Sequence, residues 1–145
     1  MINYSTLKQI QKKERNSSTL SNIPRTFYAE CSNYFHKLEN TDISSFDLRL
    51  YHNAFNCYTE IVERRLEKIN RKAYFHSIST YKLNSEPEDK DAERPENCLE
   101  CEYNMFKKLI VIYIDFYKER YEEYLQDKRE SDMINEYIKQ RDDEI

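Results

Sequence analysis

Residues 51–73 read YHNAFNCYTEIVERRLEKINRKA, and apolar or aromatic side chains recur in them at roughly helical spacing. The side chains that carry this spacing are Tyr51, Ala54, Tyr58, Ile61, Leu66, Ile69 and Ala73. Such a spacing places them along one side of an α-helix. We therefore expect a long helix that begins after Ser44 or Ser45, where serine suits the N-cap, and continues into the seventies.

A second long helix is expected in the last third of the chain. Its main apolar face is formed by Leu99, Tyr103, Phe106, Ile110, Tyr113, Tyr117 and Tyr124, and the face is widened by Met105, Leu109, Ile112 and Phe116. So broad an apolar arc predicts a helix buried between neighbours. The run from Leu109 to Ile114 alone would suit a buried strand, but its helical flanks and the lack of turn residues favour a helix.

Two shorter helices are expected before residue 44. Residues 3–15 carry Tyr4, Leu7 and Ile10 at steps of three, and polar residues between them indicate a short amphipathic helix. Pro24 suits the first turn of the next helix, with Asn22 or Ile23 near the cap. The apolar stripe of that helix would consist of Phe27, Cys31, Tyr34 and Leu38.

Two segments differ in composition from these helices. Residues 84–97 contain two prolines and six acidic residues, which is typical of a solvated, flexible loop. Residues 126–145 are mostly charged and have only a thin apolar stripe, from which we expect either a docked short helix or a frayed end. The stripe is formed by Met133, Ile134, Tyr137 and Ile138. The helical domain itself is expected to cover residues 1–125.

The composition of the chain favours an all-α fold. The 145 residues suffice for one domain, and the sequence has no glycine and only three prolines, so tight hairpins and phosphate-binding glycine loops lack their usual residue. We predict a single helical bundle of four main helices, with or without a short fifth. Four cysteines, no secretory segment and no apolar run long enough to span a bilayer favour an intracellular, cytoplasmic protein with reduced thiols.

The charge is distributed unevenly along the chain. The net charge is −4, but residues 1–83 have 13 Lys or Arg against 8 Asp or Glu, while residues 84–145 have 10 against 19. The most basic stretch is residues 64–72, where Arg64, Lys68 and Lys72 would line one helix face and Arg65 would lie nearer the apolar side. In one interpretation these cations contact phosphate groups. In the other they are solvated or pair with acidic partners.

The sequence offers little to a catalytic interpretation. Cys98 and Cys101 form one C-x-x-C pair without a second pair, so a zinc site is not expected, and a capping turn at the start of the fourth helix explains them as well. We expect no cofactor and no catalytic residue, because no nucleophile elbow or oxyanion-forming loop is visible. A small enzyme resembling chorismate mutase would need Arg and Lys side chains to converge in a buried anion pocket, which solvated charges oppose.

Three stretches of the chain resemble the GINS subunits of archaea, in the subunit type whose helical domain comes first. Residues 4–7 (YSTL), 12–17 (KKERNS), 20–24 (LSNIP) and the pair Phe27 and Tyr28 are similar to the opening helix, turn and Phe-Tyr pair of that family. Residues 51–54 (YHNA) and 61–69 (IVERRLEKI) are similar to its Asn-Ala and Arg-Arg-x-x-Lys-Ile pattern. Residues 103–125 match its last long helix in character.

The resemblance implies a non-catalytic scaffold in DNA replication. GINS chains assemble as homo- or hetero-tetramers and join the MCM helicase and a RecJ-like, Cdc-type protein, while the ATP chemistry belongs to MCM. The family also has a small β-rich second domain, for which no strand pattern follows residue 125 here, either naturally or because the chain is a shortened piece. The alternative is a helical nucleic-acid-binding or regulatory protein that uses the basic face at 64–72.

Seven residues are the candidates for interaction in this interpretation. At the N-terminal end they are expected to serve packing or subunit contact, and on the third helix ionic contact, although all could be structural. The N-terminal candidates are Tyr4, Leu7, Phe27 and Tyr28, and the ionic candidates are Arg64, Arg65 and Lys68. Any direct contact with DNA is expected to be weak, because the chain is acidic overall.

Overall fold

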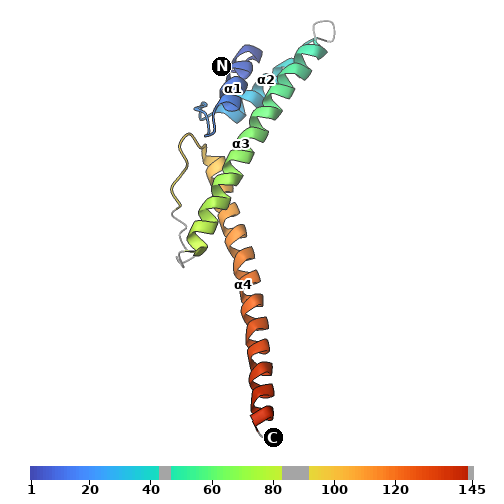
Figure 1. Ribbon diagram of the computed structural model, residues 1–145. Coiled ribbons are helices and arrows are strands. Elements are labelled where there is room, and N and C mark those ends of the chain that lie inside the picture. The colour runs from blue at the N-terminus through green and yellow to red at the C-terminus, as the bar shows by residue number, and fades with distance from the viewer. Residues whose placement is uncertain (43–46, 83–91, 144–145) are drawn as a thin grey trace.

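The computed structural model describes residues 1–42, 47–82 and 92–143, and of Tyr81 and Lys82 only the backbone. Those residues form four helices and no strand, which confirms the all-α, single-domain prediction. The helices are α1 (Tyr4–Asn16), α2 (Phe27–Glu39), α3 (Leu48–Lys82) and α4 (Glu100–Asp143). α1 and α2 lie beside the first half of α3, and α4 lies beside its second half and then continues alone (Figure 1).

Polar residues fix where the helices begin. The Asn3 side chain accepts a hydrogen bond from the Thr6 backbone N–H at 2.9 Å, and Thr6 Oγ1 accepts one from the Asn3 N–H at 2.7 Å, which is a capping box. For α3, Asp47 Oδ1 accepts from the Leu50 N–H at 3.1 Å. The expected caps Ser44 and Ser45 lie outside the described residues.

α2 begins later than its proline suggests. The carbonyl of Pro24 accepts a hydrogen bond from the N–H of Phe27 at 3.0 Å, so residues 24–27 form a separate turn. The helix then begins at Phe27 with Thr26 as its N-cap. The prediction that Asn22 or Ile23 would lie near the cap was therefore wrong by about one turn of helix.

The apolar side chains form two clusters along α3. The first joins α1, α2 and the first half of α3, and it contains Ile2, Leu7, Ile23, Phe27, Cys31, Phe35, Ala54, Cys57, Ile61 and Leu99. The second joins the second half of α3 to α4, and it contains Leu20, Ile69, Ala73, Ala92, Cys98, Phe106, Ile110 and Ile114. Leu66, predicted to belong to the apolar stripe, is exposed instead.

α3 and α4 run side by side in the same direction, so the chain returns along them before α4 begins (Figure 1). Part of this return lies in the segment predicted to be a solvated loop. Residues 83–91 are outside the described residues, but Ala92 and Pro95 are buried, and the Ala92 carbonyl accepts a hydrogen bond from the Tyr103 hydroxyl at 2.8 Å. Residues 92–97 are therefore held in place by Ala92 and Pro95, while the other four side chains of this segment are exposed, as in a solvated loop.

The last part of α4 projects from the rest of the structure as a helical arm, residues 118–143 (Figure 1). The expected boundary at residue 126 is absent, because no residue there interrupts the helix, and i,i+4 contacts such as Gln126 Nε2 to Glu130 Oε1 at 3.1 Å support it. The tail is thus neither a docked short helix nor a frayed end. Of the described helices, only α3 packs along α4, so Ile112 and Phe116, predicted to be buried, are exposed.

A pair of phenylalanine substitutions tests this division between core and surface. We expect Phe27→Ala to lower the free energy of unfolding by about 3–5 kcal/mol, because Phe27 is fully buried in the first cluster. The matched change Phe116→Ala should cost less than about 1 kcal/mol, because that ring is more than half exposed. Urea unfolding followed by circular dichroism measures both, and equal losses would contradict the fold.

Candidate functional site

A buried cluster of charges, which we call the ionic junction, lies between the two apolar clusters and consists of Glu14, Arg65, Lys68 and Glu102. Arg65 stands on α3 between Ile61 of the first cluster and Ile69 of the second. Its side chain is fully buried, and that of Glu14 is too. The two cations balance the two carboxylates, so the junction is neutral as a whole.

Arg65 uses every N–H of its guanidinium group. Nε donates to Glu102 Oε2 and Nη2 to Glu102 Oε1, both at 2.8 Å, which is the two-pronged geometry typical of arginine and a carboxylate. Nη1 donates to Glu14 Oε1 at 2.5 Å and to the Ser21 carbonyl at 2.9 Å. Nη2 also donates to the Asn97 carbonyl at 2.8 Å. All five donors of the group are therefore satisfied.

Lys68, one turn further along α3, binds the end of α1. Its ammonium group donates to the Glu14 carboxylate, to the Glu14 carbonyl at 2.8 Å and to the Thr19 carbonyl at 3.0 Å. The Glu14 carbonyl belongs to the last turn of α1, where carbonyls lack partners within the helix and a cation is favourable. Ser21 Oγ completes the site by donating to Glu14 Oε1 at 2.6 Å.

Glu102 serves the junction and the start of α4 at once. Its Oε1 accepts a hydrogen bond from the Leu99 N–H at 2.9 Å, which is the position of a glutamate in a capping box. Asn97 precedes the helix with a φ of 63°, a left-handed conformation that asparagine tolerates better than most residues. This turn places the Asn97 carbonyl on Arg65, and the Asn97 side chain donates to the Leu20 carbonyl at 3.2 Å.

The junction keeps both carboxylates ionised. Burial opposes the ionisation of Glu14, but hydrogen bonds from Lys68, Ser21 and Arg65 outweigh it and lower its pKa below the ordinary value. Burial also opposes the ionisation of Glu102, and its pKa is lowered by Arg65, by the Leu99 N–H and by the Tyr28 hydroxyl. The pKa of Tyr28 is raised mainly by burial and further by the nearby Glu102 carboxylate. The phenol therefore keeps its proton and remains a hydrogen-bond donor.

The four N-terminal candidates belong to the first apolar cluster or pack against it, and one of them, Tyr28, also contacts the ionic junction. Leu7 and Phe27 are fully buried in the first cluster, and Tyr4 and Tyr28 are partly buried against it. The Tyr28 hydroxyl donates to Glu102 Oε2 at 2.8 Å, which ties α2 to α4. Tyr4 faces outward enough for the Lys8 ammonium to lie 5.3 Å from its ring centroid.

The three ionic candidates all bind carboxylates of the chain itself. Arg65 is fully buried, as its expected place near the apolar side implied, and Lys68 is mostly buried. Arg64 donates through Nε to Glu60 at 3.3 Å, and Arg71 binds Glu67 at 3.0 Å. Four of the five cations in residues 64–72 are therefore paired within the fold, which agrees with the acid-pairing interpretation of this stretch rather than with a free cationic face.

The junction also bears on the enzyme alternative. Arg and Lys side chains do converge on buried negative charge, but that charge belongs to Glu14 and Glu102, so their side chains occupy the space that a substrate anion would need. Among the described residues no three His, Cys, Asp or Glu side chains are grouped to hold a metal ion. Cys98 is buried and Cys101 is exposed, both as free thiols.

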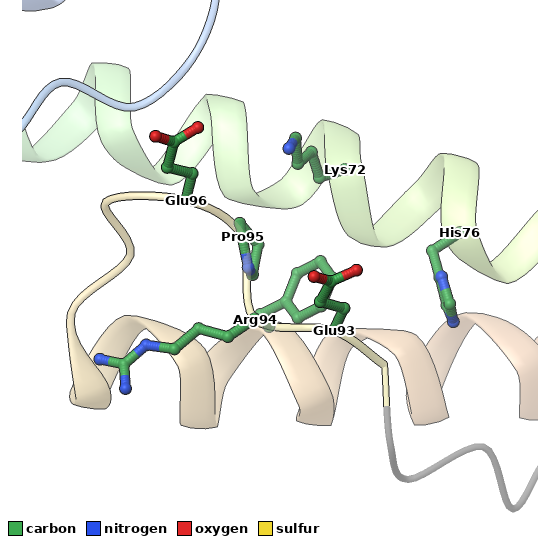
Figure 2. Close-up of a pocket in the computed structure, with 7 residues that line it drawn as sticks. Lys72, His76, Glu93, Arg94, Pro95 and Glu96 are labelled. Carbon is green, nitrogen blue, oxygen red and sulfur yellow. The ribbon is translucent and has the colours of Figure 1, made fainter.

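A hollow of about 700 Å³ lies beside the junction, between α3, residues 93–96 and α4. Figure 2 shows Arg94 extended away from His76 along the surface, and its Nε donates to the Cys98 carbonyl at 2.8 Å. His76 Nε2 is buried and has no hydrogen-bond partner among the described residues. The charged side chains around the hollow diverge, so it lacks the convergent polar groups of a ligand site.

Two functional residues, Glu14 and Glu102, were missed by sequence reasoning. Both carry a signal that could have identified them. Glu14 is the only acidic residue in the first 29, within a run of basic residues, and Glu102 is at the third position of a helix. No family model, no curated protein and no solved structure matches this chain. No described helix is both long and apolar enough to cross a membrane.

Removal of the Arg65 guanidinium should be far more damaging than removal of its neighbour. We expect Arg65→Met to lower the free energy of unfolding by about 3–5 kcal/mol, because it leaves two carboxylates buried without a cation. The matched change Arg64→Met should cost at most about 1 kcal/mol, since Arg64 is partly exposed and makes one i,i+4 ion pair. Urea unfolding at neutral pH gives both values, and similar costs would show that the junction does not stabilise the fold.

Acid should weaken the junction in a predictable range. The folded-state pKa values of Glu14 and Glu102 lie below the ordinary value of about 4.3, so their contribution to stability is complete above that pH. It is lost as the pH falls through the folded-state values. We expect urea unfolding midpoints to decrease steadily below about pH 4. The decrease should be shallower in Glu14→Gln, and an unchanged slope in that variant would contradict the assignment.

Proposed function

We propose that this chain is a non-catalytic scaffold subunit of the GINS type, which assembles with other GINS chains at the chromosome in the cytoplasm. In this proposal it supports the MCM replicative helicase together with a RecJ-like, Cdc-type protein, and it contributes no catalytic residue of its own. The observation that carries the proposal is the helical arm, residues 118–143. The arm projects from the rest of the described structure (Figure 1) and exposes the apolar side chains of Met133, Ile134, Tyr137 and Ile138.

The end of the arm has the character of a docking surface. Met133, Ile134, Tyr137 and Ile138 are each between 50 % and 71 % exposed. Ile134, Tyr137 and Ile138 follow one another at steps of three and one, so they share one side of the helix. An isolated helix gains little stability in water, and most helices in proteins are stabilised by packing of an apolar side. A partner that covers this stripe would supply such packing.

The charges around the stripe suit a protein partner. Residues 118–143 carry nine carboxylates and six cations, which surround the apolar side chains with polar groups of both signs. Protein interfaces combine an apolar centre rich in aromatic residues and methionine with a polar rim. The arm has that composition, with tyrosines at 121, 124 and 137 and a methionine at 133.

The ionic junction gives the arm a fixed direction. Arg65 holds α4 to α3 through Glu102 at the first turn of α4, and the second apolar cluster continues this packing as far as Ile114. Tyr113 Oη donates to Asn70 and so adds a polar contact between the same two helices. An arm anchored along this length can hold bound proteins in a defined orientation, which is what a scaffold requires.

Capture of partners by matched variants tests the proposal. The tagged chain, the variant Ile134→Glu/Ile138→Glu and the control Asn135→Glu/Lys139→Gln are each used to bind proteins from a lysate of the source organism, which are then identified by mass spectrometry. The control makes the same change of net charge at exposed positions on the side of the arm away from the stripe. We expect another GINS chain, MCM or a RecJ-like protein to be enriched by the native chain and by the control.

The isoleucine variant should lose that enrichment by at least about tenfold, because charge on an interface centre opposes its desolvation. Circular dichroism should show an unchanged helical fold in both variants. The proposal fails if none of these replication proteins is enriched over beads alone. It also fails if the two variants behave alike, since binding would then not depend on the stripe.

A further inference from the structure

The outward face of α1, here Tyr4, Ser5, Lys8, Lys12 and Arg15, is cationic. The helix has four basic residues and a single carboxylate, that of Glu14. The Glu14 side chain is buried inside the structure, where its negative charge is paired with Arg65 and Lys68. Burial of the only acidic side chain therefore leaves the outside of α1 with positive charges alone.

These cations are aligned along one side of the helix. Lys8, Lys12 and Arg15 are separated by steps of four and three residues, which brings their side chains onto a common face. They border a shallow hollow of about 750 Å³ that Tyr4, Ser5 and neighbouring amide side chains also line. Positive charges and neutral hydrogen-bond donors therefore meet on one surface.

Most of this charge is not neutralised within the chain. Arg15 binds Glu60 of α3 at 2.8 Å, and Gln11 donates to the same carboxylate. In contrast, Lys8 and Lys12 are exposed and pair with no carboxylate among the described residues. Two lysines at the centre of the face are thus available to an external anion.

The composition of the face distinguishes between two classes of polyanion. Protein interfaces are depleted in lysine and need an apolar centre, and the outward face of α1 offers no aliphatic side chain and only the ring of Tyr4. Phosphates of nucleic acids are bound by Lys, Arg, Ser, Asn, Gln and Tyr side chains, which are the residue types found here. The face therefore matches a phosphate backbone more closely than an acidic protein.

The acidic half of the chain does not prevent this binding. The arm, with nine carboxylates against six cations, projects from the opposite end of the structure (Figure 1). At about 1.5 Å per residue the arm is about 39 Å long. Because it extends away from α1 over several times the Debye length of about 10 Å at about 0.1 M salt, charges on most of it are largely screened from α1.

We propose that the outward face of α1 binds the phosphodiester backbone of a nucleic acid, without reading its sequence. This inference concerns a different surface from the arm, so it stands or falls independently of the scaffold proposal. Contact with about three phosphates of a single strand predicts a logarithmic salt dependence of binding with a slope of about −2. Binding is expected to be weak, in the micromolar range or above at physiological salt, as for other non-specific contacts.

Fluorescence anisotropy with a labelled single-stranded DNA of about 20 nucleotides tests the proposal on the full chain at about 50 mM salt. The variant Lys8→Gln/Lys12→Gln is compared with Lys118→Gln/Lys128→Gln, which removes the same charge from exposed lysines of the arm. We expect the α1 variant to bind about tenfold more weakly, with a salt slope smaller by about 1.4. The arm variant should bind like the native chain.

Three results would overturn the proposal. The first is that the native chain does not bind the DNA at low salt, and the second is that both variants lose the same affinity, which would indicate a general charge effect. The third is that a glutamate-rich peptide displaces the DNA at a lower concentration than unlabelled DNA does, which would assign the face to an acidic protein segment. Unchanged circular dichroism of both variants ensures that lost binding is not lost folding.

Discussion

The guanidinium group of Arg65 is the contact on which the other parts of this structure depend. It binds a carboxylate on α1, a carbonyl before α2, a carbonyl in the turn before α4 and a carboxylate on α4. Each of these segments could pack against α3 through apolar side chains alone, but apolar contact does not fix a register. Five hydrogen bonds of defined direction do fix it, and an unpaired buried charge makes other registers costly.

The helices could be predicted from the sequence because their signals are local. The apolar spacings in residues 51–73 and in residues 3–15 depend on neighbours within about one turn, and the absence of glycine adds to them. The ends of helices were less certain, since Pro24 is compatible with either a first helical turn or a separate turn before Phe27. The continuation of α4 beyond residue 125 was missed because a charged, weakly amphipathic helix has the composition of a frayed end.

The site could be predicted only in part, because the burial of a charge depends on distant residues. Arg64, Arg65 and Lys68 were recognised as ionic. They lie at different angles around the axis of the same helix, and the sequence does not show which of these angles faces Glu14. Arg65 and Glu14 are 51 residues apart, and Arg65 and Glu102 are 37 apart. No periodicity extends over such separations, so the pairing of these charges became visible only in the folded chain.

The order in which the junction is completed has a consequence for synthesis on the ribosome. Glu14 is made first and has no cation within reach until α3 supplies Arg65 and Lys68. Those two cations then exceed the single carboxylate until Glu102 follows, roughly two to seven seconds later at about 5–20 residues per second. During that interval the nascent chain carries an excess positive charge at its centre. The arm is made after all four residues of the junction, so its apolar stripe becomes accessible only once the charges of the junction can be neutralised and the helices before it can pack.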